Sequence, residues 1–225
     1  YEENPLMTMQ GQSEIKEMVQ STGVEVRSIC ADFFMDCPMH AKEKSQSAFS
    51  LETLRRLVES CGKLGIKDIV IPCVDQSSIY EEESTNRFLS AIQSVIPLSE
   101  SLEVRLCLET DLPPDRFLRL LKELDSDFVS VNYDTGNSVS LGYDFKEELA
   151  AYGNSITDLH IKDRIYGGGS VPLGEGGMNF EEFFSCFSKI NFEGIMILQA
   201  YRDDEGLKIF TRQLEFLRET LSNHY

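Results

Sequence analysis

The chain has 225 residues, of which 41% are hydrophobic; this is enough to bury one sizeable core, and the length does not require a second domain. The net charge of −17 at pH 7 repels polyanions, so neither nucleic acid nor an anionic membrane is expected as a partner. No apolar stretch approaches the roughly 20 residues of a membrane helix and no signal peptide is evident, so we expect a cytoplasmic protein.

Helix and strand signals alternate from one end of the chain to the other, which is typical of βα units that build a parallel sheet. Apolar and β-branched runs predict strands at 24–30, 66–74, 104–108, 128–131, 156–161 and 195–198. Helical spacing of apolar residues, with Gly and Pro at the ends, predicts helices at 13–20, 51–58, 86–96, 113–124 and 207–221.

These elements predict a (β/α)8 barrel of the TIM type, with residues 1–225 forming a single domain. Six strands are present, and Tyr1 to Pro5 reads as the exit of a seventh. Because a complete barrel has about 250 residues, we expect this chain to lack the first βα unit and most of the second strand. An open doubly wound sheet is the alternative, although no GxGxxG or Walker pattern supports it.

Polar residues follow four consecutive predicted strands, at the ends that would meet in the mouth of a barrel. They are Glu109, Asp134, His160 and Gln199. A carboxylate at one strand end alone is more often a helix cap or a loop residue, and the run of four is what favours a site. Carboxylate, imidazole and amide donors together suit Mn²⁺, Mg²⁺ or Zn²⁺.

Four motifs resemble the xylose isomerase-like superfamily of sugar isomerases and epimerases, over nearly the whole chain. They are the segments 106–109 (LCLE), 134–137 (DTGN), 159–164 (LHIKDR) and 171–176 (VPLGEG). The resemblance implies that Glu109, Asp134 and His160 are metal ligands and that Glu109 is also an acid/base. It also implies a small polyhydroxylated substrate and allows a homodimer.

Two positions depart from the family pattern. Gln199 stands where the family usually has a second glutamate, and its amide can ligate a metal but cannot act as a base. Asn137 stands where histidine is common. A metal that bridges two substrate oxygens would acidify the neighbouring C–H and stabilise an enediolate. With Glu109 as the one base, these residues are easier to reconcile with aldose–ketose isomerisation than with two-base epimerisation.

Further polar residues are expected to bind the substrate: Lys162, Arg164, Asn137 and Arg202. Lys162 and Arg164 could neutralise a phosphate or carboxylate, with backbone N–H groups of residues 167–170 nearby; a flexible loop of solvated charges is the other interpretation. Glu175 and the Asn179-x-x-Glu182 pattern are assigned to a loop and a helix cap. Six cysteines without CxxC spacing are expected to be buried thiols in a reducing compartment.

Three functional hypotheses remain open at this point. The first is a metal-dependent isomerase or epimerase of a small sugar, sugar acid or sugar phosphate. The second is a degenerate barrel without catalysis that binds a polyol or a protein partner, as Gln199 would allow. The third is phosphodiester cleavage in the manner of endonuclease IV, which three histidines and the charge of −17 do not favour.

Overall fold

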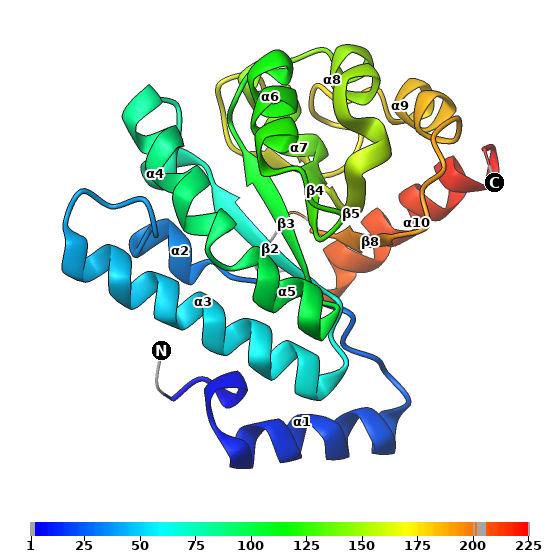
Figure 1. Cartoon of the computed structure of the whole chain (residues 1–225). Coiled ribbons are helices and arrows are strands. Elements are labelled where there is room, and N and C mark those ends of the chain that lie inside the picture. The colour runs from blue at the N-terminus through cyan, green and yellow to red at the C-terminus, as the bar shows by residue number, and fades with distance from the viewer. Residues whose placement is uncertain (1–2, 200, 202–205, 225) are drawn as a thin grey trace. The chain divides into compact units, whose positions relative to one another are not determined.

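The structure of the chain, a computed structural model, describes residues 3–199, 201 and 206–224 (Figure 1). It divides into two compact units. Unit 1 comprises residues 1–112 and 119–130, and unit 2 comprises residues 113–118 and 131–225. Each unit contains three parallel strands with helices, so the predicted alternation of strands and helices is present in both.

Unit 1 contains three strands in the order β1-β2-β3, all parallel: β1 (Ser28–Cys30), β2 (Asp68–Cys73) and β3 (Arg105–Thr110). Its helical elements are η1 (Pro5–Met7), α1 (Met9–Thr22), α2 (Phe33–Asp36), α3 (Lys44–Leu64), η2 (Asp75–Ser77), α4 (Glu82–Gln93) and α5 (Ile96–Leu102). All six residues of β2 are buried, as expected for a parallel strand covered on both faces.

Two predicted elements of unit 1 have different bounds in the structure. The strand expected at 24–30 covers only Ser28–Cys30, since Val24 and Val26 are 66% and 40% exposed and β-branching alone does not make a strand. The helix expected at 86–96 is two helices, α4 and α5, because Pro97 lies in the first turn of α5. Proline lacks an N–H donor and restricts the preceding residue, so a single helix cannot continue through it.

Unit 2 contains most of β4 (Val129–Asp134) together with β5 (Ile156–Ile161) and β8 (Ile195–Leu198), in the parallel order β4-β5-β8. Its helical elements are α7 (Thr135–Leu141), α8 (Phe145–Tyr152), η3 (Gly153–Ser155), α9 (Phe180–Phe187) and α10 (Leu207–Ser222). Helix α6 (Pro114–Leu124) contributes residues to both units. An antiparallel hairpin, β6 (Asp163–Arg164) with β7 (Ser170–Val171), replaces the loop expected there.

The core of unit 2 is aromatic on one side of the sheet and holds a buried carboxylate. Phe183 lies between Tyr133 and Phe187, with ring centroids 5.7 and 5.3 Å away. Next to it, Glu148 accepts hydrogen bonds from the hydroxyls of Tyr133, Tyr152 and Ser138. Burial raises the pKa of Glu148, although these hydroxyls act in the opposite direction by stabilising the carboxylate.

The prediction of six buried cysteines is wrong for half of them. Cys61, Cys73 and Cys107 are buried, whereas Cys30 is exposed, and Cys37 and Cys186 are intermediate. None of the six forms a disulfide, and the apolar sequence around Cys30 did not reveal that β1 is short and partly accessible.

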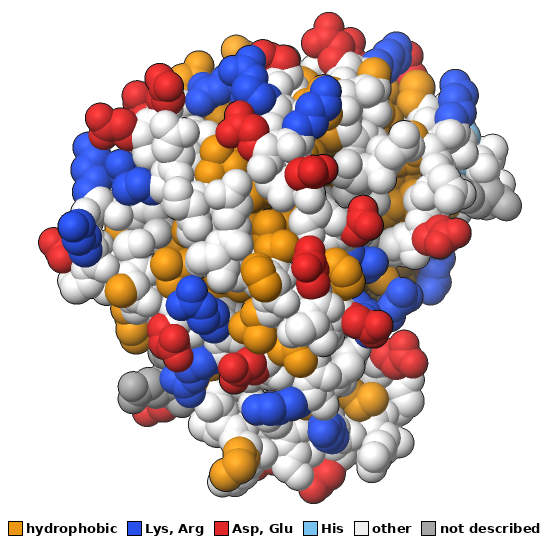
Figure 2. All heavy atoms as spheres, in the orientation of Figure 1, with side chains coloured by type: hydrophobic (Ala, Val, Ile, Leu, Met, Phe, Trp, Pro, Cys, Tyr) orange, Lys and Arg blue, Asp and Glu red, His pale blue; other side chains and the backbone are white. Residues whose placement is uncertain are grey.

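The excess negative charge is distributed rather than gathered. Figure 2 shows acidic and basic side chains interspersed over the face that it draws, among the described residues. Within the described part of the chain, no helix has both the length and the apolarity needed to cross a bilayer.

Candidate metal site

Asp134 is the last residue of β4 and the N-cap of α7. Its Oδ1 accepts the backbone N–H groups of Gly136 and Asn137, at 2.8 and 2.9 Å. This cap satisfies two of the N–H groups that a helix leaves open at its start, and it fixes the carboxylate at the carboxyl end of the strand. Asp134 as a whole is 5% exposed, so its second oxygen, Oδ2, lies in a largely dry environment.

The two residues after Asp134 connect the ends of β4 and β5. The Thr135 hydroxyl accepts the backbone N–H of Lys162 at 2.9 Å and donates to the backbone carbonyl of Lys162 at 2.6 Å. At Gly136, an added Cβ would lie 2.9 Å from Lys162 Cγ and 3.1 Å from Arg164 Cγ. The threonine therefore fixes the chain at Lys162, and the glycine leaves room for the stems of two basic side chains.

His160 lies on β5 opposite Asp134, as its direct partner in the strand register. Its ring is 1% exposed, and its Nδ1 lies 3.1 Å from Asn132 Nδ2 and 2.9 Å from Gln199 Nε2. In the tautomer with the lone pair on Nδ1 and the proton on Nε2, both amides can donate to Nδ1. Asp134 and His160 each offer a ligand atom, and these atoms lie within 4.8 Å of one another.

Lys162 and Arg164 differ in the direction they take. Lys162 Nζ lies 3.8 Å from Asp134 Oδ2 and 3.4 Å from Gln199 Oε1. Arg164 instead donates to Asn137 Oδ1 at 3.0 Å and to the Gly168 carbonyl at 2.9 Å. Lys162 is thus directed at the candidate ligands and Arg164 at the β6–β7 hairpin, and their predicted role in substrate binding stays a prediction.

Glu109 belongs to unit 1, where it lies at the carboxyl end of β3, beside Pro72 of β2. It is 7% exposed. The thiol of Cys73 is its neighbour: burial, then the charges of Asp111 and Glu109, raise the pKa of Cys73 well above its usual value. Because that thiol stays protonated at neutral pH, it adds no charge beside the carboxylate.

Asn132 and Asp163 are polar residues that the sequence analysis did not assign a role. Asn132 could have been identified as a candidate from the sequence, because side chains alternate between the two faces of a strand and Asn132 therefore shares a face with Asp134. The carboxylate of Asp163 accepts four backbone N–H groups, from Arg164, Gly174, Gly176 and Met178. It thereby holds the 172–178 segment, a role that depends on a loop geometry the sequence does not reveal.

The other predicted positions fall outside the cluster or outside the described residues. Arg202 lies outside the described residues, as does Tyr1. Glu175 is exposed in its loop, and Asn179 caps α9 by accepting the Glu182 N–H at 3.2 Å, as predicted. His224 pairs with Glu181 at 3.0 Å on the surface.

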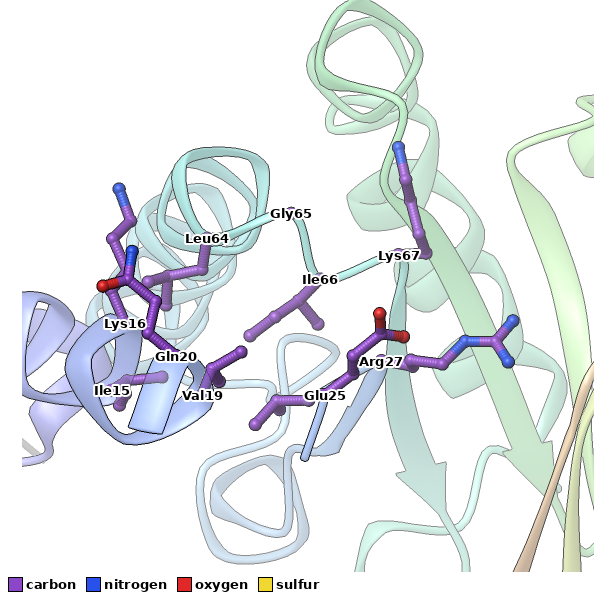
Figure 3. A pocket seen from close by; sticks show the side chains of 11 residues that line it. Ile15, Lys16, Val19, Gln20, Glu25, Arg27, Leu64, Gly65, Ile66 and Lys67 are labelled. Carbon is purple, nitrogen blue, oxygen red and sulfur yellow. The ribbon is translucent and has the colours of Figure 1, made fainter. Parts of the chain in front are cut away.

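A hollow of about 380 Å³ in unit 1 lies at the opposite ends of the strands (Figure 3). Ile15 and Val19 of α1 and Ile66 before β2 form its apolar lining. In Figure 3 the charged ends of Lys16, Lys67 and Arg27 lie well apart from one another, so they do not form a common anion site. Since the barrel fold places its chemistry at the carboxyl ends of strands, this hollow is not the candidate active site.

Comparison with known proteins identifies the family. Residues 2–220 match the family model described as xylose isomerase-like TIM barrel. The chain belongs to this family. Its fold is accordingly that of a TIM barrel, as the sequence predicted, and the carboxyl ends of its strands are where the members of that fold carry their chemistry.

Two curated relatives and one solved structure give the range of similarity. The chain is 25% identical to the 2-epi-5-epi-valiolone 7-phosphate 2-epimerase of Actinoplanes over 216 residues, covering 93% of this chain and 77% of the relative. It is also 25% identical to the L-ribulose-5-phosphate 3-epimerase UlaE of Escherichia coli over 195 residues, covering 82% and 68%. The xylose isomerase domain protein of Planctomyces limnophilus superposes with a TM-score of 0.82 at 15% identity, covering 99% and 86%.

The donor set of unit 2 fits a divalent metal. Asp134 and His160 are buried and each offers a ligand atom within 4.8 Å of the other, and the Gln199 amide lies against the same imidazole. Two structural neighbours are described with metals: the IOLI protein with zinc (TM-score 0.73, 14% identity, 94% of each chain) and a Mycobacterium smegmatis barrel with magnesium (TM-score 0.74, 15% identity, 98% and 80%). Carboxylate with imidazole is compatible with either ion and does not discriminate between them.

Proposed function

We propose that this chain is a metal-dependent isomerase or epimerase of a small sugar, sugar acid or sugar phosphate. The proposed metal ligands are Glu109, Asp134, His160 and Gln199, and Glu109 is the proposed acid/base. The observation that carries the proposal is the cluster of the buried Asp134 and His160 with the half-buried Gln199, which we call the polar cluster, at the carboxyl ends of β4, β5 and β8. Its relatives include phosphosugar epimerases, which supports the substrate class.

The inclusion of Glu109 follows from the fold. Glu109 is buried at the carboxyl end of β3, and in a TIM barrel the carboxyl ends of neighbouring strands face one mouth. We therefore propose that residues 1–225 act as one domain, since the family match runs through both units.

In the proposed reaction each side chain has a separate task. A bound divalent ion would supply Lewis acidity to the substrate carbonyl and so acidify the C–H of the adjacent hydroxyl-bearing carbon. Glu109 removes this proton and returns it to the former carbonyl carbon, while the hydroxyl proton passes from one substrate oxygen to the other. Gln199 cannot supply a second base, so proton transfer along one face, as in aldose–ketose isomerisation, is the preferred form.

Proton exchange tests this proposal. The protein is incubated in D₂O with Mn²⁺ and a panel of pentoses, hexoses and their phosphates, and deuterium at carbon is followed by NMR. We expect exchange with at least one substrate, its loss with chelator, and a decrease of about 10³-fold in Glu109→Gln, the usual contribution of a positioned base. Asp111→Asn is the matched control. Asp111 directly follows the same strand, but its Oδ1 accepts a hydrogen bond from the Ser78 hydroxyl at 2.8 Å.

Two results would count against the proposal. Exchange that survives unchanged in Glu109→Gln would remove Glu109 as the base. Thermal stabilisation by a polyol without exchange of any proton would instead favour a barrel that binds its ligand without catalysis.

A further inference from the structure

Lys162 is a cation placed among side chains that would hold a metal ion. Its Nζ lies 3.8 Å from Asp134 Oδ2 and 3.4 Å from Gln199 Oε1. The lysine side chain is 26% exposed, whereas that of Asp134 is 2% exposed. The ammonium therefore approaches the buried carboxylate from the wetter side of the cluster.

The position of Lys162 is fixed by its backbone and its stem. Thr135 accepts its N–H and donates to its carbonyl, and Gly136 gives its Cγ and Cδ the space that a Cβ would fill. A lysine on a free loop would rarely hold one direction, because its rotamers cost about 2 kcal/mol of entropy to order. Here the fold itself directs the side chain at Asp134.

Lys162 also sets the orientation of the Gln199 amide. With Oε1 facing the ammonium, Nε2 faces His160 Nδ1 at 2.9 Å. An amide turned the other way would place its own N–H groups against the ammonium, which is unfavourable. To ligate a metal through Oε1, the Gln199 amide has to rotate and lose its hydrogen bond with Lys162.

We infer that Lys162 competes with a divalent cation for Asp134 and Gln199, and so sets the metal affinity of this site. The inference rests on the proposed function. A divalent ion at Asp134 and His160 would be repelled by an ammonium held 3.8 Å from Asp134 Oδ2, and its amide ligand would be turned away. Lys162 is thus a positioning residue whose charge weakens metal binding and keeps it reversible.

The test is metal affinity, measured by calorimetry with Mn²⁺ and Zn²⁺ on the full chain. In Lys162→Met, which keeps the stem and removes the charge, we expect affinity to rise on the order of tenfold, as expected for an opposing charge at this range in a partly solvated site. The metal affinity of Lys162→Gln should rise similarly, and that of Lys162→Arg should stay near the wild-type value. Arg164→Met is the charge-matched control: its guanidinium binds Asn137 and the Gly168 carbonyl, so the rise should be clearly smaller.

The outcomes separate the inference from the proposed function. If wild type and Lys162→Met bind Mn²⁺ with equal affinity, or the variant binds more weakly, the inference is overturned and the metal site stands. An equal rise in the metal affinity of Arg164→Met would show that the effect comes from net charge alone, which would also overturn the inference. If neither the wild type nor any variant binds a metal, both proposals fall. Thermal melts without metal identify any variant that does not fold, and the Gln variant then takes the place of Met.

Discussion

The carboxyl ends of the strands in the two units carry different chemistry. In unit 2, the residues at the ends of β4, β5 and β8 contact one another, with the His160 ring against Gln199 and both Gln199 and Asp134 near Lys162. In unit 1, β1 and β2 end at Cys30 and Cys73, and β3 carries the buried carboxylate of Glu109. Unit 2 therefore holds a connected set of polar groups, whereas unit 1 offers one carboxylate beside a neutral thiol.

A connected polar set fixes the directions of its side chains, which is what selective metal binding requires. Four predictions, from the largest expected effect to the smallest, can break or sharpen this comparison.

The buried network of unit 2 should be costly to interrupt. Glu148→Ala leaves the hydroxyls of Tyr133, Tyr152 and Ser138 without their acceptor, and we expect a loss of about 3 kcal/mol or more in the free energy of unfolding. Tyr152→Phe removes one of these donors and should cost about 1 kcal/mol. Urea unfolding measures both, and a cost for Glu148→Ala no larger than that for Tyr152→Phe would contradict the expected penalty for leaving three hydroxyls without their acceptor.

Asp134 should dominate metal affinity within unit 2. Asp134→Asn keeps an oxygen to accept the Gly136 N–H and so retains the helix cap, but loses the charge. We expect metal affinity to fall by about 100-fold, within the range seen when a metal ligand or its oriented partner is changed. Calorimetry with Mn²⁺ measures this, and an affinity like that of the wild type would exclude Asp134 as a ligand.

His40 is the isolated titratable group in the core of unit 1. Burial, and then the charge of Arg87, lower its pKa from 6.5 to about 4. The pKa of His40 is lower in the folded chain than in the unfolded chain. Its contribution to the free energy of unfolding is therefore complete above pH 6.5. This contribution is lost as the pH falls toward 4, because the unfolded chain takes up the proton first. At pH 5 this loss is about 2 kcal/mol.

The measurement compares wild type with His40→Gln by urea unfolding at pH 7 and pH 5. The wild type should lose more stability than the variant between these two values, because glutamine does not titrate. If both chains lose the same amount, His40 does not contribute to the acid sensitivity.

The amino ends of the unit 1 strands should matter least. Lys67 forms an ion pair with Glu103 at 3.4 Å, and both side chains are more than half exposed. Lys67→Ala should therefore change the free energy of unfolding by no more than about 0.5 kcal/mol. Metal affinity should not change, and a clear change would show that the hollow in Figure 3 is coupled to the carboxyl ends.

Much of the fold could be predicted from periodicity. The strands predicted at 104–108, 156–161 and 195–198 appear as Arg105–Thr110, Ile156–Ile161 and Ile195–Leu198, each within two residues of its predicted bounds. The short helices α7 and α8 were missed, because α7 begins directly at the Asp134 cap and has too few residues for a period to appear. The β6–β7 hairpin was missed for a similar reason, since two-residue strands carry no alternation.

The sequence alone determined the family, the alternation of strands and helices, and the identity of the polar residues at the strand ends, because these depend on local order along the chain. Only the tertiary structure decided where those side chains point. Lys162 and Arg164 are two residues apart and chemically alike, yet Thr135 and Gly136 direct one at Asp134 while Asn137 and Gly168 hold the other at a hairpin. Contacts between residues distant in the chain set that difference, and a linear pattern does not contain them.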